Sequence, residues 1–109
     1  MIDINEFNKL EIRVREILEA EEFPEADTAA YKLKIDFGNY GIKWSSAQIT
    51  NNYSVKELYG RQVIAVMNLG SKKIGSFNSE VLVMGADDEN GFVRLLDVNK
   101  RIKNGAKVN

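Results

Sequence analysis

The chemistry most readily open to this chain is contact with an anion at a short basic loop. Residues 70–76 (GSKKIGS) place Lys72 and Lys73 side by side, among Gly and Ser and without an acidic residue. In a loop rich in glycine and serine, backbone N–H groups are available to bind an oxyanion, and the two adjacent ammonium groups attract such an anion. The same composition is typical of a solvated hairpin tip, so the loop alone leaves both interpretations open.

Catalysis has little support in the residue types present. The 109 residues include no Cys and no His, which excludes disulfides, thiol catalysis and a Ser-His-Asp triad, and removes the usual zinc ligands. The one carboxylate cluster, residues 87–89 (DDE), precedes an Asn-Gly turn signal and lacks the spacing of a calcium loop. We therefore expect a protein that is not an enzyme and that has no metal and no cofactor.

Length and composition are those of a small soluble domain. The chain is 44% hydrophobic and 28% charged, and its length suits a single domain. No apolar run approaches the ~20 residues of a membrane span, and the acidic first residues do not resemble a signal peptide. Together with the lack of Cys, these features lead us to expect a cytoplasmic protein without membrane insertion.

The charged residues are unevenly distributed along the chain, although the net charge is only −1. Residues 1–30 carry nine acidic and three basic side chains, and residues 31–86 carry three acidic and seven basic ones. Residues 87–109 are nearly balanced, with four acidic and five basic. The middle of the chain is therefore the part expected to meet an anionic partner.

Strands must position these side chains, and the clearest strand pattern is the alternation over residues 31–37 (YKLKIDF). It predicts a core position for Tyr31, Leu33, Ile35 and Phe37, and a solvent position for Lys32, Lys34 and Asp36. Residues 12–20 also alternate until Ile17-Leu18, where we expect a bulge or bend. A turn at residues 38–41 leads into a third strand, 42–49, in which Trp44 is in phase with Ile42 and is expected in the core or at its rim.

Two short helices and three further strands complete the prediction. Asp3 is a candidate N-cap for a helix within residues 3–10, and Ser54 for one within residues 54–59 that Gly60 closes. Strands are expected at residues 62–69 and 79–84, on either side of the basic loop, and at residues 92–96 after an acidic turn.

This order of elements fits an all-β fold, an OB-fold Greek-key barrel with a short N-terminal helix and a small helix between strands three and four. An SH3-like barrel or a general α+β sheet is the alternative. Residues 1–109 form one domain. Its terminal segments, 1–11 and 97–109, carry apolar side chains that a monomeric barrel would leave uncovered. We therefore expect a homodimer, with an interface formed by Ile4, Phe7, Leu10, Val98, Ile102 and Val108.

Several segments resemble a known family. Residues 22–26 (EFPEA), 41–50 (GIKWSSAQIT) and 77–85 (FNSEVLVMG) resemble the tRNA-binding-domain family, and within it the branch of CsaA-type secretion chaperones; the match runs over nearly the whole chain in the same order. The resemblance implies an OB-fold homodimer without catalytic activity, which binds tRNA by shape or binds unfolded preproteins and the export machinery. Phe23 stands where tethered tRNA-binding modules usually place His, and Gly70-Ser71 where the CsaA branch commonly has a proline pair.

The first functional hypothesis is tRNA binding through shape and backbone charge. Alternation turns the strand lysines away from the core, and two polar residues flank the basic loop at positions where the resemblance places tRNA contacts. The predicted nucleic-acid-binding residues are Lys32, Lys34, Lys43, Asn68, Lys72, Lys73 and Ser79.

The alternative hypothesis is a chaperone that binds extended hydrophobic segments of unfolded preproteins and has no physiological RNA ligand. The predicted peptide-binding residues are Trp44, Tyr53, Ile74 and Phe77. An aromatic side chain near the end of a strand belongs more often to the core than to a pocket, which applies to Trp44 and Tyr53, and the sequence does not decide between the two hypotheses.

Overall fold

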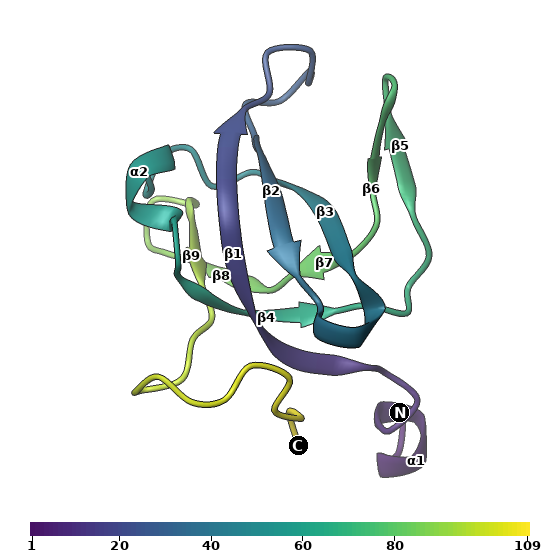
Figure 1. The fold of residues 1–109 in the computed structure, drawn as a ribbon. Helices are drawn as coiled ribbons and strands as arrows, with labels where there is room; N and C mark the ends of the chain where they lie inside the picture. The colour runs from purple at the N-terminus through teal and green to yellow at the C-terminus, as the bar shows by residue number, and fades with distance from the viewer.

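The computed structural model describes all 109 residues, and it is built around one strongly curved antiparallel sheet (Figure 1). The strand order in this sheet is β3-β2-β1-β4-β7. Its strands are β1 (Ile12–Glu22), β2 (Tyr31–Asp36), β3 (Ile42–Ala47), β4 (Gln62–Val66) and β7 (Leu82–Val83). The two edge strands, β3 and β7, approach each other, so that the sheet forms a nearly closed five-stranded barrel. The predicted all-β, OB-like fold is therefore confirmed.

Smaller elements decorate the barrel. Two separate hairpins lie outside the main sheet: β5 (Lys72–Ile74) with β6 (Phe77–Ser79), and β8 (Gly85–Asp87) with β9 (Val93–Leu95). The helices are α1 (Ile4–Phe7), the 3-10 turn η1 (Gly38–Tyr40) and α2 (Val55–Leu58). The predicted caps are present, since Asp3 accepts from the Glu6 N–H and Ser54 forms a capping box with Glu57. All three helices are far too short to cross a membrane.

The core of the barrel follows the predicted alternation of β2. Leu33, Ile35 and Phe37 are completely buried, and Tyr31 is 6% exposed. The predicted bulge in β1 is also present, because the register with β2 shifts between Ile17 and Glu19. This bulge exchanges the two faces of β1. Before the bulge the odd-numbered residues, such as Ile17, point into the barrel, and after it the even-numbered residues, such as Ala20, do so.

The phase predicted for β3 is wrong. Ser45 and Ala47 face the core, whereas Ile42 is 44% exposed and Trp44 lies partly exposed on the outer face. The buried Ser45 hydroxyl donates to the Val81 carbonyl at 3.0 Å, so its burial leaves no unpaired polar group. A small side chain with one hydrogen-bond partner fits where the two edges of the sheet approach, and the indole is turned outward.

The basic loop also differs from its prediction. It is a short β-ribbon, β5 and β6, in which Lys72 pairs with Ser79, Lys73 with Asn78, and Ile74 with Phe77. Gly75 has φ +60°, the left-handed conformation that a tight turn between the two strands requires. The predicted strand 79–84 is accordingly divided between β6 and β7.

The barrel is closed largely by side chains. The Glu80 N–H donates to the Trp44 carbonyl at 2.8 Å, and the Glu80 carboxylate accepts from the Trp44 N–H at 3.1 Å. The Ser79 hydroxyl accepts from the Ser46 N–H at 3.0 Å. We call residues 79–81 and the facing part of β3 the closing edge. In a regular sheet the N–H groups of β3 would bond to backbone carbonyl groups of a neighbouring strand. Here the side chains of Ser79 and Glu80 supply these acceptors.

The terminal segments fold back on their own chain and partly cover the apolar side chains of the predicted dimer interface. A second apolar cluster, formed by Ile12, Val14, Ile64 and Val66, lies on the outer face of β1 and β4. Five of the six predicted interface residues pack against it: Phe7, Leu10, Val98, Ile102 and Val108. Ile4 is 66% exposed. The leftover apolar residues thus have a partner within the chain, and the homodimer stays a prediction.

Polar contacts attach the C-terminal segment to the sheet. Backbone hydrogen bonds join Val14 to Gly105 and Ala106, and Ile12 to Val108, at 2.7–3.0 Å. The buried Gln62 side chain donates to the Ile102 carbonyl at 2.6 Å and accepts from the Ile102 N–H at 3.2 Å. Residues 105–108 therefore behave as an added strand along the first half of β1.

Replacing Ser79 with Ala tests the closing edge. The substitution leaves the partly buried Ser46 N–H without its acceptor, so we expect the free energy of unfolding in urea to fall by about 1–2 kcal/mol. Ser71→Ala, at an exposed position of the same ribbon, is the matched control. Equal stability of the two variants would show that the Ser79 hydroxyl does not hold the edge.

The Asp88 carboxylate makes stability depend on pH. It accepts from the Phe92 and Asn90 N–H groups and from the Asn52 amide at 2.9–3.1 Å, and these bonds, led by that from Phe92, lower the pKa of Asp88 from its ordinary value. This stabilisation is complete above the pKa of an unfolded Asp, about 3.9, and is lost as pH falls through the lower pKa of the folded state.

We therefore expect Asp88→Asn to lower the unfolding free energy at neutral pH, and the difference from wild type to shrink as pH falls below about 4. Chemical denaturation at several pH values measures it. Asp87→Asn is the control, because the Asp87 side chain is exposed and makes no hydrogen bond. A difference that does not change with pH would contradict this role for Asp88.

Candidate nucleic-acid interface

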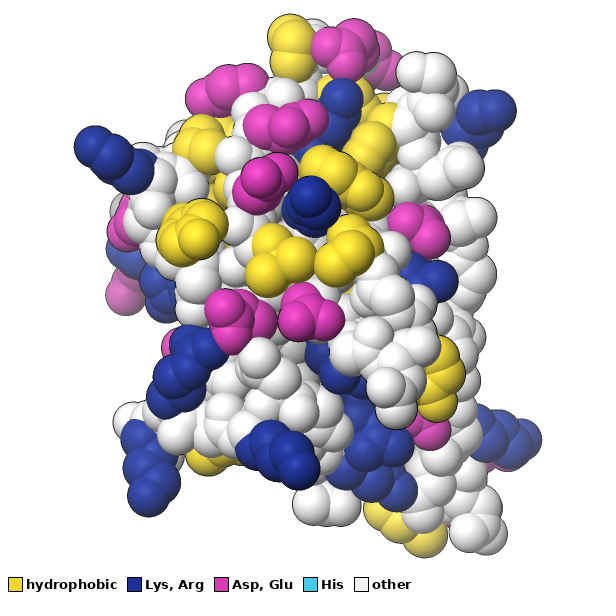
Figure 2. Space-filling view, in the orientation of Figure 1, with side chains coloured by type: hydrophobic (Ala, Val, Ile, Leu, Met, Phe, Trp, Pro, Cys, Tyr) yellow, Lys and Arg dark blue, Asp and Glu magenta, His cyan; other side chains and the backbone are white.

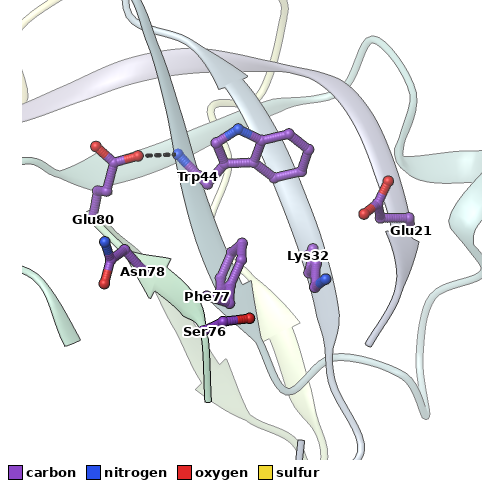
Figure 3. Close-up of a pocket in the computed structure, with 7 residues that line it drawn as sticks. All are labelled: Glu21, Lys32, Trp44, Ser76, Phe77, Asn78 and Glu80. Carbon is purple, nitrogen blue, oxygen red and sulfur yellow. Dashed lines mark hydrogen bonds between the residues drawn. The ribbon is translucent and has the colours of Figure 1, made fainter. Parts of the chain in front are cut away.

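The candidate site lies on the outer face of β2 and β3, beside the β5–β6 ribbon. A shallow pocket of about 300 Å³ opens there (Figure 3). Its lining residues come from the end of β1, from β2, β3 and β6, and from the turns next to β6: Glu21, Lys32, Trp44, Ser76, Phe77, Asn78 and Glu80. Aromatic, basic and acidic groups thus share one concave surface.

Lys32 is held within this pocket by aromatic rings. Its ammonium lies 4.8 Å from the centre of the Phe23 ring and 5.3 Å from that of Phe77, and 3.7 Å from a Glu25 carboxylate oxygen. Cation–π contacts of this kind are worth about 0.5–2 kcal/mol each. The predicted contact residue Lys32 therefore has a fixed position and a charge that is already partly compensated.

The other two strand lysines are also opposed by carboxylates. Lys43 lies 3.9 Å from Glu80. It pairs with the buried Ile35 and is in phase with Ser45, so it lies at the rim of the core-facing side of β3 and not, as predicted, on the outer face. Lys34, on the face of the pocket, lies 3.9 Å from Glu19. All of these groups are partly exposed, so the attraction in each pair is weak, but the sum of charge on this face is close to neutral. Figure 2 shows basic, acidic and hydrophobic side chains mixed over β1 and β2, without a continuous basic patch.

The ribbon lysines differ in having no carboxylate partner. Lys72 and Lys73 are exposed, and neither belongs to any of the salt bridges of the chain. The ribbon projects from the barrel beside β3 (Figure 1). Among the predicted contact residues, these two carry the charge that is most available to a phosphate.

The two polar residues predicted to contact tRNA are engaged within the chain. The Asn68 carbonyl oxygen accepts from the Glu11 N–H at 2.8 Å, and its amide donates to the Lys9 carbonyl at 2.7 Å. Ser79 belongs to the closing edge described above. Asn68 thus holds the segment that leads into β1 and Ser79 holds the closing edge, and their part in binding stays a prediction.

The structure separates the four predicted peptide-binding residues. Trp44 and Phe77 meet edge to face, with ring centres 6.2 Å apart, and Phe77 meets Phe23 at 5.1 Å. Tyr53 lies in the core, 7% exposed, where its hydroxyl accepts from the Leu95 N–H at 2.9 Å. Only Trp44 and Phe77 lie in the pocket of Figure 3.

Ile74 lines a second and larger groove, of about 520 Å³, between the end of β3, the segment 69–74 and β7. Two leucines in this groove are strongly exposed, Leu69 by 55% and Leu82 by 51%. Nine of its fifteen lining residues are hydrophobic. The molecule therefore offers one small aromatic pocket and one broad apolar groove, on either side of the ribbon.

Sequence reasoning missed Phe23, Glu21 and Glu80 as parts of the site. The resemblance drew attention to Phe23 only as the residue that stands where tethered tRNA-binding modules usually place His. The position of Glu21 could have been inferred, because the bulge turns Glu19 and Glu21 to the face of Lys34 and Lys32, with which they pair across β1 and β2. Nothing in the sequence indicated that Glu80 would reach back to β3.

Comparisons with known proteins agree with this geometry. Residues 12–107 match the family described as "Putative tRNA binding domain". The methionine–tRNA ligase of Methanocaldococcus jannaschii is 37% identical over 98% of this chain, and that of Pyrococcus furiosus 36% over 98%. The chain spans only 16% and 14% of the length of these two ligases, respectively.

Two crystal structures of chaperones match over the full length of the chain. CsaA from Picrophilus torridus is 48% identical, with a TM-score of 0.92 and complete coverage of both chains. CsaA from Bacillus anthracis is 44% identical, with a TM-score of 0.92 and coverage of 100% of this chain and 99% of that one. The family is described by binding and not by catalysis, and the chain belongs to it: this protein is a member of the tRNA-binding-domain family, with the fold of the CsaA chaperones.

Proposed function

We propose that this protein binds tRNA in the cytoplasm, without catalysis, and that the exposed lysines of the β5–β6 ribbon make the main contacts with backbone phosphates. The observation that carries the proposal is the contrast in charge compensation. Lys72 and Lys73 are free, whereas Lys32, Lys34 and Lys43 each lie next to a glutamate. Two free ammonium groups on a projecting ribbon can contact successive phosphates of a nucleic acid without a rearrangement of the other side chains of the surface.

The aromatic pocket supplies a second kind of contact. Trp44 presents a partly exposed indole beside Phe77, and an unpaired base can stack against such a surface. Stacking is tolerant of sequence, so this arrangement suits recognition of tRNA by shape and by accessible loops. Lys32, Lys34 and Lys43 contribute once RNA phosphates compete with their glutamates.

Neutralising the ribbon tests this proposal. We expect the double variant Lys72→Gln/Lys73→Gln to weaken tRNA binding and to reduce the slope of log K against log salt by roughly 1 per lysine that contacts a phosphate. Filter binding of bulk tRNA over a series of salt concentrations measures both quantities. Lys56→Gln, an exposed lysine on α2, is the matched control. Wild-type affinity and slope in the double variant would refute a phosphate-binding ribbon.

A second candidate function is a chaperone for unfolded preproteins in protein export; the two CsaA neighbours are described as chaperones. The apolar groove beside the ribbon favours it, because Leu69 and Leu82 expose hydrophobic surface next to the closing edge. An extended segment could lie along this groove between β3 and β7.

The same groove is the best remaining argument for a homodimer. A second copy of the chain can cover Leu69 and Leu82, which the terminal segments do not reach. The groove, with Ile74 at its wall, is thus a second candidate dimer contact beside the terminal segments.

Leu82→Ser distinguishes these uses of the groove. We expect the variant to lose about 1–2 kcal/mol of binding free energy toward an unfolded apolar polypeptide, if that is the occupant, or to dissociate a dimer. Light scattering gives the mass, and competition with labelled unfolded protein gives the affinity. Leu96→Ser, at an exposed leucine outside the groove, is the control. No change in either measurement would show that the groove binds neither partner.

A further inference from the structure

An unpaired arginine lies at the end of the barrel, away from the ribbon. Arg15 is 7% exposed, and it points inward because it pairs with the buried Val63 across β4 and precedes the buried Ile17 by two residues. Its guanidinium carbon lies 5.0 Å from the centre of the Phe37 ring. The arginine therefore covers the end of the hydrophobic core.

This guanidinium lacks the partners that burial requires. Arg15 Nε is buried and has no hydrogen-bond partner, and no carboxylate lies within ion-pair distance of Arg15. A buried charge without a partner is costly, and native structures nearly always provide one. Burial and the charge of Arg13 lower the pKa of Arg15, against a smaller opposite effect of Asp36 and Tyr40, and the arginine stays charged at neutral pH.

Two glycines lie next to the charge. Arg15 Nη1 lies 3.5 Å from where a Cβ of Gly38 would stand and 3.4 Å from where one of Gly105 would stand. Gly38 belongs to the turn between β2 and β3, and Gly105 to the C-terminal segment. Both have positive φ, +58° and +93°, so a side chain is disfavoured at either position. Nη1 of the guanidinium thus lies close to the backbone of both segments, and the Asp36 carboxylate, which accepts from the Gly38 N–H at 2.8 Å, is nearby.

Further cations share this face. Arg13 is two residues from Arg15 on the same face of β1. Lys107, in the C-terminal segment, forms an antiparallel bridge with Arg13. Glu11 binds Arg13 at 3.1 Å, whereas Lys107 is exposed and has no ion pair. In Figure 2 dark blue side chains gather in the lower part of the view, where Figure 1 places the first half of β1 and the C-terminal segment.

We propose that Arg15 and Lys107, with Arg13 beside them, form a binding site for a phosphoryl group between the β2–β3 turn and the C-terminal segment. A planar guanidinium offers paired donors that suit the oxygens of a phosphate, and Phe37 holds its plane fixed. The group is either free phosphate or a backbone phosphate of RNA, since both present the same oxygens. The site is separate from the ribbon, which lies at the other end of the barrel in Figure 1.

A titration of the wild-type protein tests the site directly. We expect inorganic phosphate to shift the NMR signals of the Arg15 Nε–H and of the Gly38 and Gly105 amides, while chloride at matched ionic strength leaves them in place. Lys107→Gln weakens phosphate binding about threefold, and Arg15→Met at least about tenfold. Lys100→Gln, an exposed lysine in the same C-terminal segment, is the matched control.

A second arm identifies the source of the phosphate. Shifts with both phosphate and tRNA assign the site to RNA, and shifts with phosphate alone assign it to a free phosphate. Signals that stay unmoved in tens of millimolar phosphate, or that move equally with chloride, overturn the proposal. This result is independent of the ribbon, because the phosphate arm gives the same answer whether or not Lys72 and Lys73 bind tRNA.

Discussion

The fold depends on the pairing of β1, which meets three different partners along eleven residues. Its second half pairs with β2, its first half with β4, and residues 12–14 also bond to the C-terminal segment. Both faces of the first half are covered, Ile12 and Val14 by the outer cluster and Arg15 and Ile17 by the barrel. The bulge then exchanges the faces, so that the acidic residues at the end of β1 come to lie beside the lysines of β2. One irregular position in one strand thus determines the charge of the candidate interface.

That charge pattern explains why a protein of net charge −1 can belong to a tRNA-binding family. The lysines of β2 and β3 are neutralised in pairs, which keeps nonspecific attraction low. The cations without an ion pair include Lys72 and Lys73 on the projecting ribbon, and Arg15 and Lys107 at the other end of the barrel. A surface of this kind favours a nucleic acid whose phosphates lie at the few positions of these cations. It binds less well to a polyanion that has a high charge density but does not match these positions.

The sequence predicted what local patterns determine and missed what distant packing determines. The alternation of β2 and the Ser54 cap were correct, because each depends on neighbours within a few residues. Trp44 was assigned the wrong phase, since hydrophobicity favours burial while the closing edge has space only for Ser45. The outer cluster was missed because it assembles from β1, β4 and both termini. The alternation over residues 12–20 did not single out Arg15, and only the barrel shows that this side chain points inward.

The attachment of residues 105–108 to β1 also has a kinetic consequence. Val14 bonds to Ala106 across more than ninety positions of the sequence, so the sheet cannot be completed by local steps. Contacts between such distant segments require a large loss of chain entropy before they return any stability, which slows folding. Until that contact forms, Ile12, Val14, Ile64 and Val66 remain open to other chains. Docking of the helix α1 and of the C-terminal segment covers this cluster, and it therefore protects a folding intermediate from aggregation.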